Sequence, residues 1–102
     1  MVYEVEMWAF CNGAVREVTI EGKTDLVADE LVPQLLEEIF YWGQNEVQDQ
    51  AMFSVSVGDV ARIGDDLWLC CSVGWKKLTR EEYIAYTLMS QTERILSSLR
   101  HQ

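Results

Sequence analysis

Residues 67–82, with the sequence LWLCCSVGWKKLTREE, decide the fold class of this chain of 102 residues. The stretch Leu67–Val73 is apolar at nearly every position, as expected for an inner strand that is covered on both faces. A glycine interrupts it, and Trp75–Leu78 follows as a shorter strand that completes the sheet. Thr79 and Glu82 then fit the S/T-x-x-E capping box, in which both side chains bond backbone N–H groups at the start of a helix. Strands that lead directly into a helix in this way favour an α+β fold.

A further strand precedes this stretch. Apolar residues alternate with serines over residues 53–57, which is the pattern of a half-buried strand. Gly58–Asp59 permits a bulge or a sharp bend before the strand continues at Val60–Ile63. Turn residues at 64–66 end it, so this half of the chain is expected to supply three strands.

The N-terminal residues predict a β-hairpin. Val2–Cys11 is rich in β-forming residues, and Ala14–Glu21 is the matching second strand. Between them, Asn12 and Gly13 are the pair that a two-residue type I′ turn prefers, since both positions need a positive φ. Gly22–Asp25 supplies the loop that leaves the hairpin.

An amphipathic helix is expected over residues 28–42, with Gly43 at the C′ position. If Asp29 is the N-cap, Pro33 lies near the first turn and does little damage, whereas a start near Leu26 requires a kink. The apolar side of this helix comprises Leu31, Val32, Leu35, Leu36, Ile39 and Phe40. The opposite side, which makes an acidic outer face, comprises Glu30, Gln34, Glu37, Glu38 and Tyr41.

A last helix begins at the capping box and carries one apolar stripe, with cations near its end that favour the helix dipole. The stripe comprises Tyr83, Ile84, Leu88, Ile95, Leu96 and Leu99, and the cations are Arg94 and Arg100. The element order is therefore β-β-α-β-β-β-α. We expect a single α+β domain over residues 1–102, with two helices packed on a mainly antiparallel sheet.

Ionised side chains are divided unevenly along the chain. The first sixty residues hold twelve acidic and two basic residues, whereas the remainder holds five acidic and six basic ones, for a net charge of −9. This field favours a basic partner and disfavours direct binding to nucleic acid, whose phosphates need a basic surface. No apolar run reaches the ~18 residues of a membrane span, and no signal peptide is recognisable, so we expect a cytoplasmic protein.

The residues of common catalytic and cofactor sites are missing. His101 is the only histidine and lies beside the last residue, so neither Ser-His-Asp nor Cys-His catalysis is expected. The cysteines lack zinc-site spacing, and the glycines form no phosphate-binding loop. We therefore expect no enzymatic activity, no cofactor and no metal. Adjacent carboxylates leave a Mg²⁺-dependent reaction as an alternative, and these pairs are Glu37–Glu38, Asp65–Asp66 and Glu81–Glu82.

Cys11, Cys70 and Cys71 are expected to be reduced thiols that pack as small apolar residues. Adjacent cysteines rarely form a disulfide with each other, because its geometry is strained. The odd number of cysteines and the absence of a CxxC motif also argue against a redox site.

Four tryptophans are many for so short a chain, and this residue is enriched at binding hot spots. Trp8 and Trp68 are expected inside strands of the core. Trp42, beside Tyr41, and Trp75, after a strand break, are candidates for partly exposed aromatic residues. A small basic cluster, expected to be a solvated rim, comprises Lys76, Lys77 and Arg80.

Three segments of the C-terminal half resemble a hairpin of short uncharacterised proteins from phages, plasmids and integrative elements. The shared pattern is SVGDV, here residues 56–60, then an aromatic residue two positions before a cysteine, then (S/V)-G-(W/F). Trp68, Cys70, Gly74 and Trp75 stand in the matching places. The resemblance covers about a quarter of the chain and implies an accessory gene of a mobile element, but no activity and no functional residue.

Together these features predict a non-enzymatic accessory protein that acts by occupying another protein. We expect an anti-defence inhibitor, such as an anti-CRISPR or antirestriction protein, whose carboxylates cover a basic nucleic-acid channel of its target. The residues expected to bind the partner are Asp29, Glu30, Glu37, Glu38, Tyr41, Trp42, Glu46 and Asp49. Two alternatives remain open: the acids only make the surface soluble, or the chain is a structural or regulatory module that homodimerises through its last helix or a sheet edge.

Overall fold

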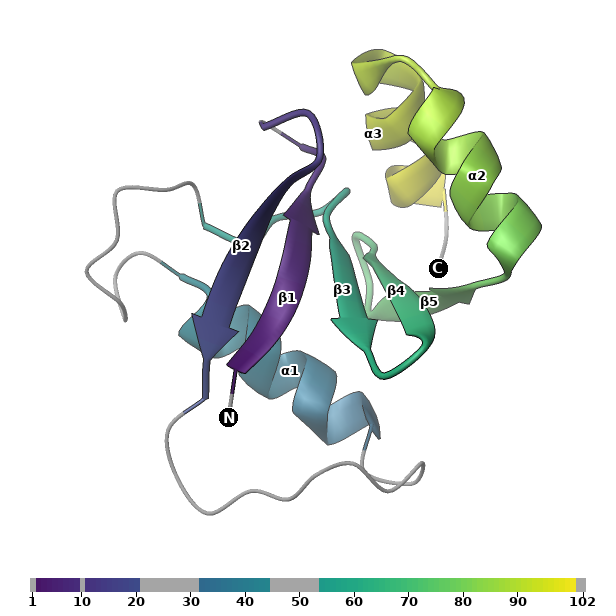
Figure 1. Ribbon diagram of the computed structural model, residues 1–102. Coiled ribbons are helices and arrows are strands. Elements are labelled where there is room, and N and C mark those ends of the chain that lie inside the picture. Colours follow the sequence, from purple (N-terminus) through teal and green to yellow (C-terminus); the bar gives the residue numbers. More distant parts are fainter. Residues whose placement is uncertain (1, 10, 21–31, 45–53, 101–102) are drawn as a thin grey trace.

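The computed structural model, which describes residues 2–9, 11–20, 32–44 and 54–100, contains a five-stranded antiparallel sheet with helices packed against it (Figure 1). The strands are β1 (Val2–Met7), β2 (Ala14–Thr19), β3 (Val60–Ile63), β4 (Asp66–Cys70) and β5 (Trp75–Leu78), in the spatial order β2-β1-β3-β4-β5. The helices of the described ranges are α1 (Val32–Trp42), α2 (Arg80–Leu88) and α3 (Gln91–Arg100). The expected α+β class and antiparallel sheet are confirmed. No helix within these ranges has the length and apolar character needed to cross a bilayer.

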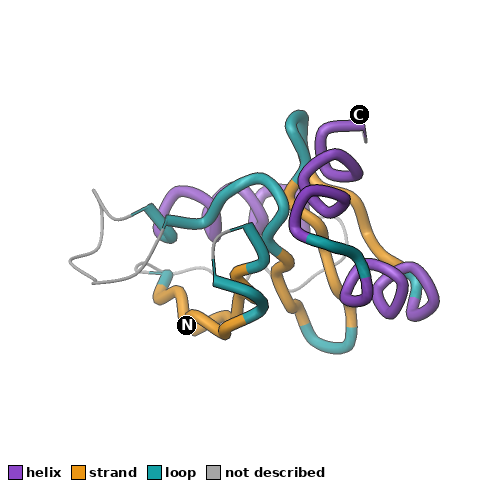
Figure 2. The backbone as a smooth tube through the Cα atoms, turned by 90° about the horizontal axis from the view of Figure 1, so that it is seen from above, coloured by secondary structure: helices purple, strands orange, loops and turns teal. Residues whose placement is uncertain are grey.

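The sheet is covered by α1 on one face and by α2 on the other. Val5 packs in one buried cluster with Leu35 of α1, and it pairs with Ala61 across the sheet. Because neighbouring residues of a strand point to opposite faces, Val60 points away from α1, and it packs in a second buried cluster with Tyr86 of α2. The C-terminal helix pair lies over the β3–β5 part of the sheet, away from the N-terminus (Figure 2).

The N-terminal hairpin contains the expected turn. Asn12 and Gly13 have φ values of 51° and 88°, and the Ala14 N–H donates to the Cys11 carbonyl at 3.2 Å. Both central residues thus have the positive φ that a type I′ turn requires. The turn predicted from Asn12-Gly13 is therefore confirmed.

The connection around this turn is longer than the predicted two residues. β1 ends at Met7, and Trp8 and Ala9 leave the sheet before the turn. The cause is a distant side chain, because the Ala9 N–H donates to Oδ1 of Asp59 at 2.9 Å instead of to a neighbouring strand. The predictions that this strand runs to Cys11 and that Trp8 lies within it are therefore wrong.

Residues 54–57 do not form the predicted strand. The Val55 N–H donates to the Gly43 carbonyl at 3.1 Å, and the Ser56 N–H donates to Oδ2 of Asp59 at 2.9 Å. Backbone groups that are bonded in this way are not available to a sheet ladder, so backbone bonds to β4 begin only at Gly58 and Asp59, just before β3. Val55 is nevertheless fully buried, so the alternation correctly marked an inward side chain.

The predicted single C-terminal helix is in fact two helices. α2 ends at Leu88, and Met89 has an extended backbone with φ −71° and ψ 155°. α3 then begins after Ser90, whose Oγ accepts the Glu93 N–H while the Glu93 carboxylate accepts the Ser90 N–H, each at 3.2 Å. This second S-x-x-E capping box is present in the sequence, and it outweighs the apolar stripe that suggested a continuous helix.

The apolar stripe is exposed rather than buried. Leu88 is 81% exposed and Ile84 is 48% exposed, and the same holds to a lesser degree for Ile95, Leu96 and Leu99. The buried positions of these helices are instead Tyr86, Arg94 and Ser98. The prediction that the stripe packs on the sheet holds only for Tyr83, which is half-buried against the second cluster, and is wrong for the other five residues. The first capping box is confirmed, since Oγ1 of Thr79 accepts the Glu82 N–H at 3.1 Å.

The described part of α1 follows the predicted pattern. Its buried residues are Val32, Leu35, Leu36 and Ile39, while Gln34, Glu37 and Tyr41 are exposed. Phe40 departs from the pattern, because it is 37% exposed at the helix surface. The predicted Asp29 cap and the alternative start near Leu26 lie outside the described residues.

Gly43 ends α1 because a side chain would not fit there. A Cβ at this position would lie 2.4 Å from Cγ2 of Val55 and 2.8 Å from the Ile39 carbonyl oxygen. The Gly43 carbonyl also accepts a hydrogen bond from Nη1 of the buried Arg16 at 2.6 Å. The predicted helix end is confirmed, but its cause is close packing rather than a left-handed backbone.

We expect Gly43→Ala to lower the free energy of unfolding by about 2 kcal/mol, because the added methyl group forces α1 away from Val55. Urea denaturation measures this change. Gln34→Ala, at an exposed position of the same helix, is the matched control and should change the stability by less than about 0.5 kcal/mol. Equal stability of the Gly43 variant and the wild type would show that a side chain at this position fits beside Val55 and would contradict this expectation.

Candidate partner-binding surface

The structure places half of the residues that were expected to bind a partner. Glu37, Glu38, Tyr41 and Trp42 all lie on the last two turns of α1. The other four, namely Asp29, Glu30, Glu46 and Asp49, lie outside the described residues. The candidate surface is therefore defined by the described end of α1 and by the residues that border it.

The four placed residues differ in how freely they can contact a partner. Glu37 and Tyr41 are exposed one helical turn apart, and Tyr41 is 56% exposed. Glu38 is half-buried, and its Oε2 accepts the indole N–H of Trp42 at 3.0 Å. Trp42 packs against the core below α1 and meets the Tyr41 ring edge-on, with 5.2 Å between centroids. Tyr41 is thus the accessible aromatic residue of this pair, while Trp42 and Glu38 support it.

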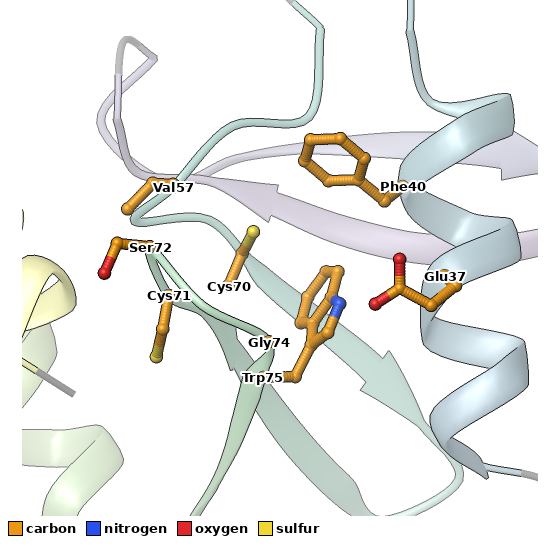
Figure 3. Close-up of a pocket in the computed structure, with 8 residues that line it drawn as sticks. All are labelled: Glu37, Phe40, Val57, Cys70, Cys71, Ser72, Gly74 and Trp75. Atoms are coloured by element: carbon orange, nitrogen blue, oxygen red, sulfur yellow. The ribbon is translucent and has the colours of Figure 1, made fainter. Parts of the chain in front are cut away.

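A groove of about 170 Å³ opens between α1 and the connection from β4 to β5. Glu37 and Phe40 line it from the helix, and Trp75 lines it from the start of β5, so two rings and one carboxylate surround the same space (Figure 3). Cys70 and Val57 form the inner wall. Sequence reasoning did not connect Trp75 with the acidic helix, because the two segments are far apart in the chain and no local pattern links them.

The Cys70 thiol at this wall is chemically inert. Burial raises the pKa of Cys70 to about 12, and the nearby charges of Asp59, Cys71 and Glu37 raise it further. A thiol that stays protonated at neutral pH is a poor nucleophile. Cys70 and Cys71 are buried, Cys11 is half-buried, and all three are free thiols, so the expectation of reduced cysteines is confirmed apart from the exposure of Cys11.

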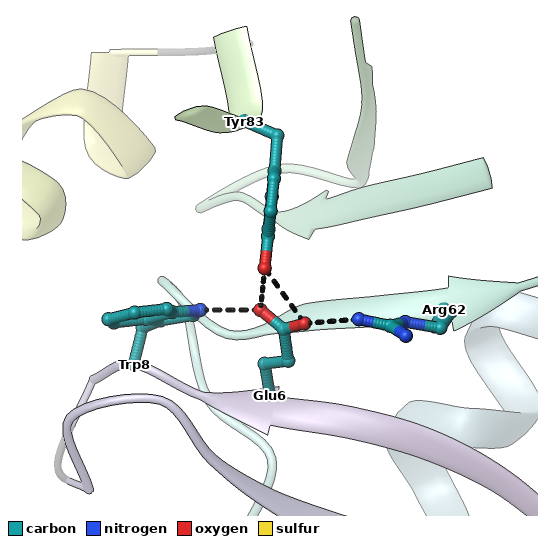
Figure 4. Close-up of polar contacts among 4 residues, drawn as sticks. All are labelled: Glu6, Trp8, Arg62 and Tyr83. Atoms are coloured by element: carbon teal, nitrogen blue, oxygen red, sulfur yellow. Dashed lines mark hydrogen bonds and ion pairs between the residues drawn. The ribbon is translucent and has the colours of Figure 1, made fainter. Parts of the chain in front are cut away.

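Two acids that were counted toward the negative field are buried structural groups. The first is Glu6, which is 5% exposed and accepts hydrogen bonds from three side chains (Figure 4). Its donors are the indole N–H of Trp8 at 2.9 Å, the hydroxyl of Tyr83 at 2.8 Å and Nη2 of Arg62 at 2.7 Å. Glu6 therefore ties the sheet to α2, and its charge is matched by Arg62.

The second buried acid is Asp59, which is fully inaccessible to solvent. Its two carboxylate oxygens accept the backbone N–H groups of Ala9 and Ser56, each at 2.9 Å. Burial raises the pKa of Asp59 to about 6, although these hydrogen bonds and the positive charge of Arg16 act in the opposite direction. Asp59 is therefore a structural residue that a partner cannot contact.

Trp8 packs against the C-terminal helices and is therefore a structural residue rather than a partner-binding one. Its ring lies under the guanidinium of Arg94, with 4.6 Å between Cζ and the ring centroid, and it meets Tyr86 edge-on at 6.4 Å. Arg94 also donates to the carbonyls of Met89 and Thr87, which close the end of α2. The ring and the carbonyl oxygens offset part of the cost of burying this cation, although its Nε has no hydrogen-bond partner among the described residues.

The basic cluster is largely neutralised by local ion pairs. Lys76 pairs with Glu82 at 2.7 Å, and Lys77 pairs with Asp66 at 3.4 Å, while Arg80 is exposed. Glu37, by contrast, forms no ion pair with any residue that the structure describes. Among these residues, no basic side chain of the cluster therefore pairs with Glu37 or Glu38 of α1.

No group of three or more histidine, cysteine, aspartate or glutamate side chains within the described ranges is arranged to hold a metal ion. Comparison of the chain with protein-family models, curated proteins and solved structures finds no match. The geometry of the surface is therefore the basis for a functional proposal.

The raised pKa of Asp59 predicts a pH-dependent stability. Between about pH 4 and pH 6 the native carboxyl keeps a proton that the unfolded chain, with the ordinary value of 3.8, has released. The contribution of Asp59 to the free energy of unfolding should therefore fall by about 2 kcal/mol as the pH rises from 4 to 7. Urea denaturation over this pH range gives the free energies of unfolding of the wild type and of Asp59→Asn. The pH dependence of their difference measures the contribution of Asp59.

Other titrating groups cancel in that difference, since both proteins share them. A stability difference that stays constant or grows with pH would contradict the assignment. If Asp59→Asn does not fold, the carboxyl carbon of Asp59 in the wild type should still titrate by NMR with a midpoint near 6.

Proposed function

We propose that this chain is a non-enzymatic protein-binding accessory protein of a mobile genetic element, and that it acts as an anti-defence inhibitor. Its acidic surface would occupy the nucleic-acid-binding site of a CRISPR or restriction effector. The observation that carries the proposal is the end of α1, where Glu37 is exposed beside Tyr41 and has no ion-pair partner among the described residues.

The mechanism is competition for cations. Lysine and arginine side chains that bind phosphates also bind carboxylates, because both anions present oxygen acceptors in similar geometry. The net charge of −9 attracts a basic channel and raises the rate of association. Tyr41 adds apolar contact area next to the charges, which is the composition of many binding hot spots.

The positions of the basic side chains also affect the negative field of this surface. Arg16 and Arg94 are buried, and Arg62, Lys76 and Lys77 are each paired with an acid. Arg62, Lys76 and Lys77 therefore do little to reduce the field that a partner meets at α1, whereas Arg16, which bonds the Gly43 carbonyl at the end of this helix, offsets part of it.

We expect the protein to displace labelled nucleic acid from a purified CRISPR or restriction effector, and we expect added salt to weaken this effect. Glu37→Lys/Glu38→Lys should weaken the inhibition by about 10- to 100-fold at low salt, because two favourable charge contacts become repulsive. Nucleic-acid displacement over a panel of such effectors, measured by fluorescence anisotropy, checks both expectations.

The matched control is Glu4→Lys/Glu17→Lys. These two exposed glutamates face each other across β1 and β2, and the double change shifts the net charge equally. The control should inhibit nearly as well as the wild type. Equal loss in both variants would mean that only net charge matters, and absence of inhibition across the panel would remove the proposal.

The exposed stripe of the C-terminal helices favours a second candidate, a homodimerising structural or regulatory module. Leu88, Leu96 and Leu99 are 81%, 45% and 47% exposed, respectively. Apolar side chains gathered on helices in this way are common at interfaces between identical subunits. In that case the acidic surface would only maintain solubility.

If the second candidate is correct, sedimentation should detect a dimer, and Leu96→Glu/Leu99→Glu should convert it to a monomer. The reason is that a buried charge without a partner is not tolerated in an apolar interface. Val15→Glu is the control, because Val15 is also 51% exposed but lies on β2. A wild-type protein that is monomeric at high concentration would exclude this candidate.

A further inference from the structure

We infer that the groove between α1 and the start of β5 is a socket for the guanidinium group of an arginine side chain from the partner. The inference rests on the proposed function, which it deepens by naming the group that the surface recognises. Three properties of the groove support it: its rings, its carboxylate and its size.

Two aromatic rings border the groove. Trp75 and Phe40 come from opposite sides of the groove, one from β5 and the other from α1 (Figure 3). Phe40 is 37% exposed, and Trp75 is half-buried where it packs against the core below α1, so both rings are partly accessible to a ligand. A cation over an aromatic face is attracted by the negative charge at the centre of the ring, and tryptophan is the strongest partner of this kind.

The carboxylate supplies the charge that makes the site selective. Glu37 faces the Trp75 ring across the groove (Figure 3), and it forms no ion pair with another described residue. Its charge also reaches the inner wall, where it contributes to the raised pKa of Cys70. The described lining contains no lysine, arginine or histidine that could compete for Glu37, and the Cys70 thiol adds no second negative charge because it stays protonated.

The volume fits a side chain rather than a cofactor. Sites for drug-sized ligands and cofactors measure roughly 300–1,000 Å³. The groove measures about 170 Å³, which is below that range. A guanidinium group with its neighbouring methylene groups fills such a space.

Arginine fits this lining better than lysine. A guanidinium is planar and weakly hydrated, so it can stack on an indole ring while its edge donates hydrogen bonds to a carboxylate. A lysine ammonium is compact and strongly hydrated, and it cannot use the ring face and the carboxylate in one plane. The groove therefore predicts a partner with an exposed arginine. In the partner's own complex with nucleic acid, this arginine would contact a phosphate.

The test uses a small probe, so that no effector has to be known. N-acetyl-arginine amide is titrated into the full chain, and the indole N–H signals of the tryptophans are followed by NMR. We expect the Trp75 signal to shift with a dissociation constant on the order of 1–10 mM, as is reasonable for so small a ligand. N-acetyl-citrulline amide has the same shape without the charge, and it should leave the signal unchanged.

Two variants assign the site. Glu37→Gln should weaken arginine binding about 5-fold, because it removes the charge and keeps the shape. Glu17→Gln is the control, since Glu17 is an exposed glutamate on β2 outside the groove lining, and it should bind the probe as the wild type does. Equal shifts with citrulline, no shift at Trp75, or equal losses in both variants would each overturn the socket.

The failures of the socket and of the proposed function are distinguishable. The socket is wrong if the probe does not shift Trp75, even when the protein displaces nucleic acid from an effector. The proposed function is wrong if no effector is inhibited, even when the arginine probe binds.

Discussion

The carboxylate of Asp59 is the interaction on which the rest of the structure depends. It is fully buried, and it holds the backbone of Ala9 and Ser56 in place of the hydrogen bonds of a sheet. These bonds join the end of β1 to the segment before β3, two parts of the chain that are separated by fifty residues. A buried carboxylate with backbone donors on both oxygens is costly to disrupt, so the sheet cannot extend at this corner and the chain must turn there.

That corner decides where the C-terminal helices lie. Because Ala9 is held by Asp59, Trp8 leaves the sheet and presents its ring to Arg94 and Tyr86. Gln91 also donates to the Ala9 carbonyl, so the start of α3 is fixed to the same turn. The helix pair therefore buries Tyr86, Arg94 and Ser98 and leaves most of its apolar stripe exposed. The exposed leucines are accessible to a second subunit, while α1 and its carboxylates lie on the opposite side of the sheet.

The surface of α1 depends on tight packing beneath it. The buried Arg16 bonds the Gly43 carbonyl, and the absence of a side chain at Gly43 lets Val55 approach the helix end. This packing holds α1 against the sheet while Phe40 and Glu37 face the groove that Trp75 lines. A binding surface with rigid walls loses little conformational entropy when a ligand enters, so the supporting contacts matter as much as the charged residues.

Local chemistry determined several features from the sequence alone. The Asn12-Gly13 turn, the Thr79–Glu82 capping box and the buried side of α1 each depend on neighbouring residues, so a short segment contains all the information. Only the tertiary structure decided that Glu6 and Asp59 are buried, that Arg94 is inside while Leu88 is outside, and that Trp75 meets Glu37. Each of these outcomes depends on donors or rings supplied from a distant part of the chain, and the free energy of burying a charge is set by such partners rather than by the residue's own neighbours in sequence.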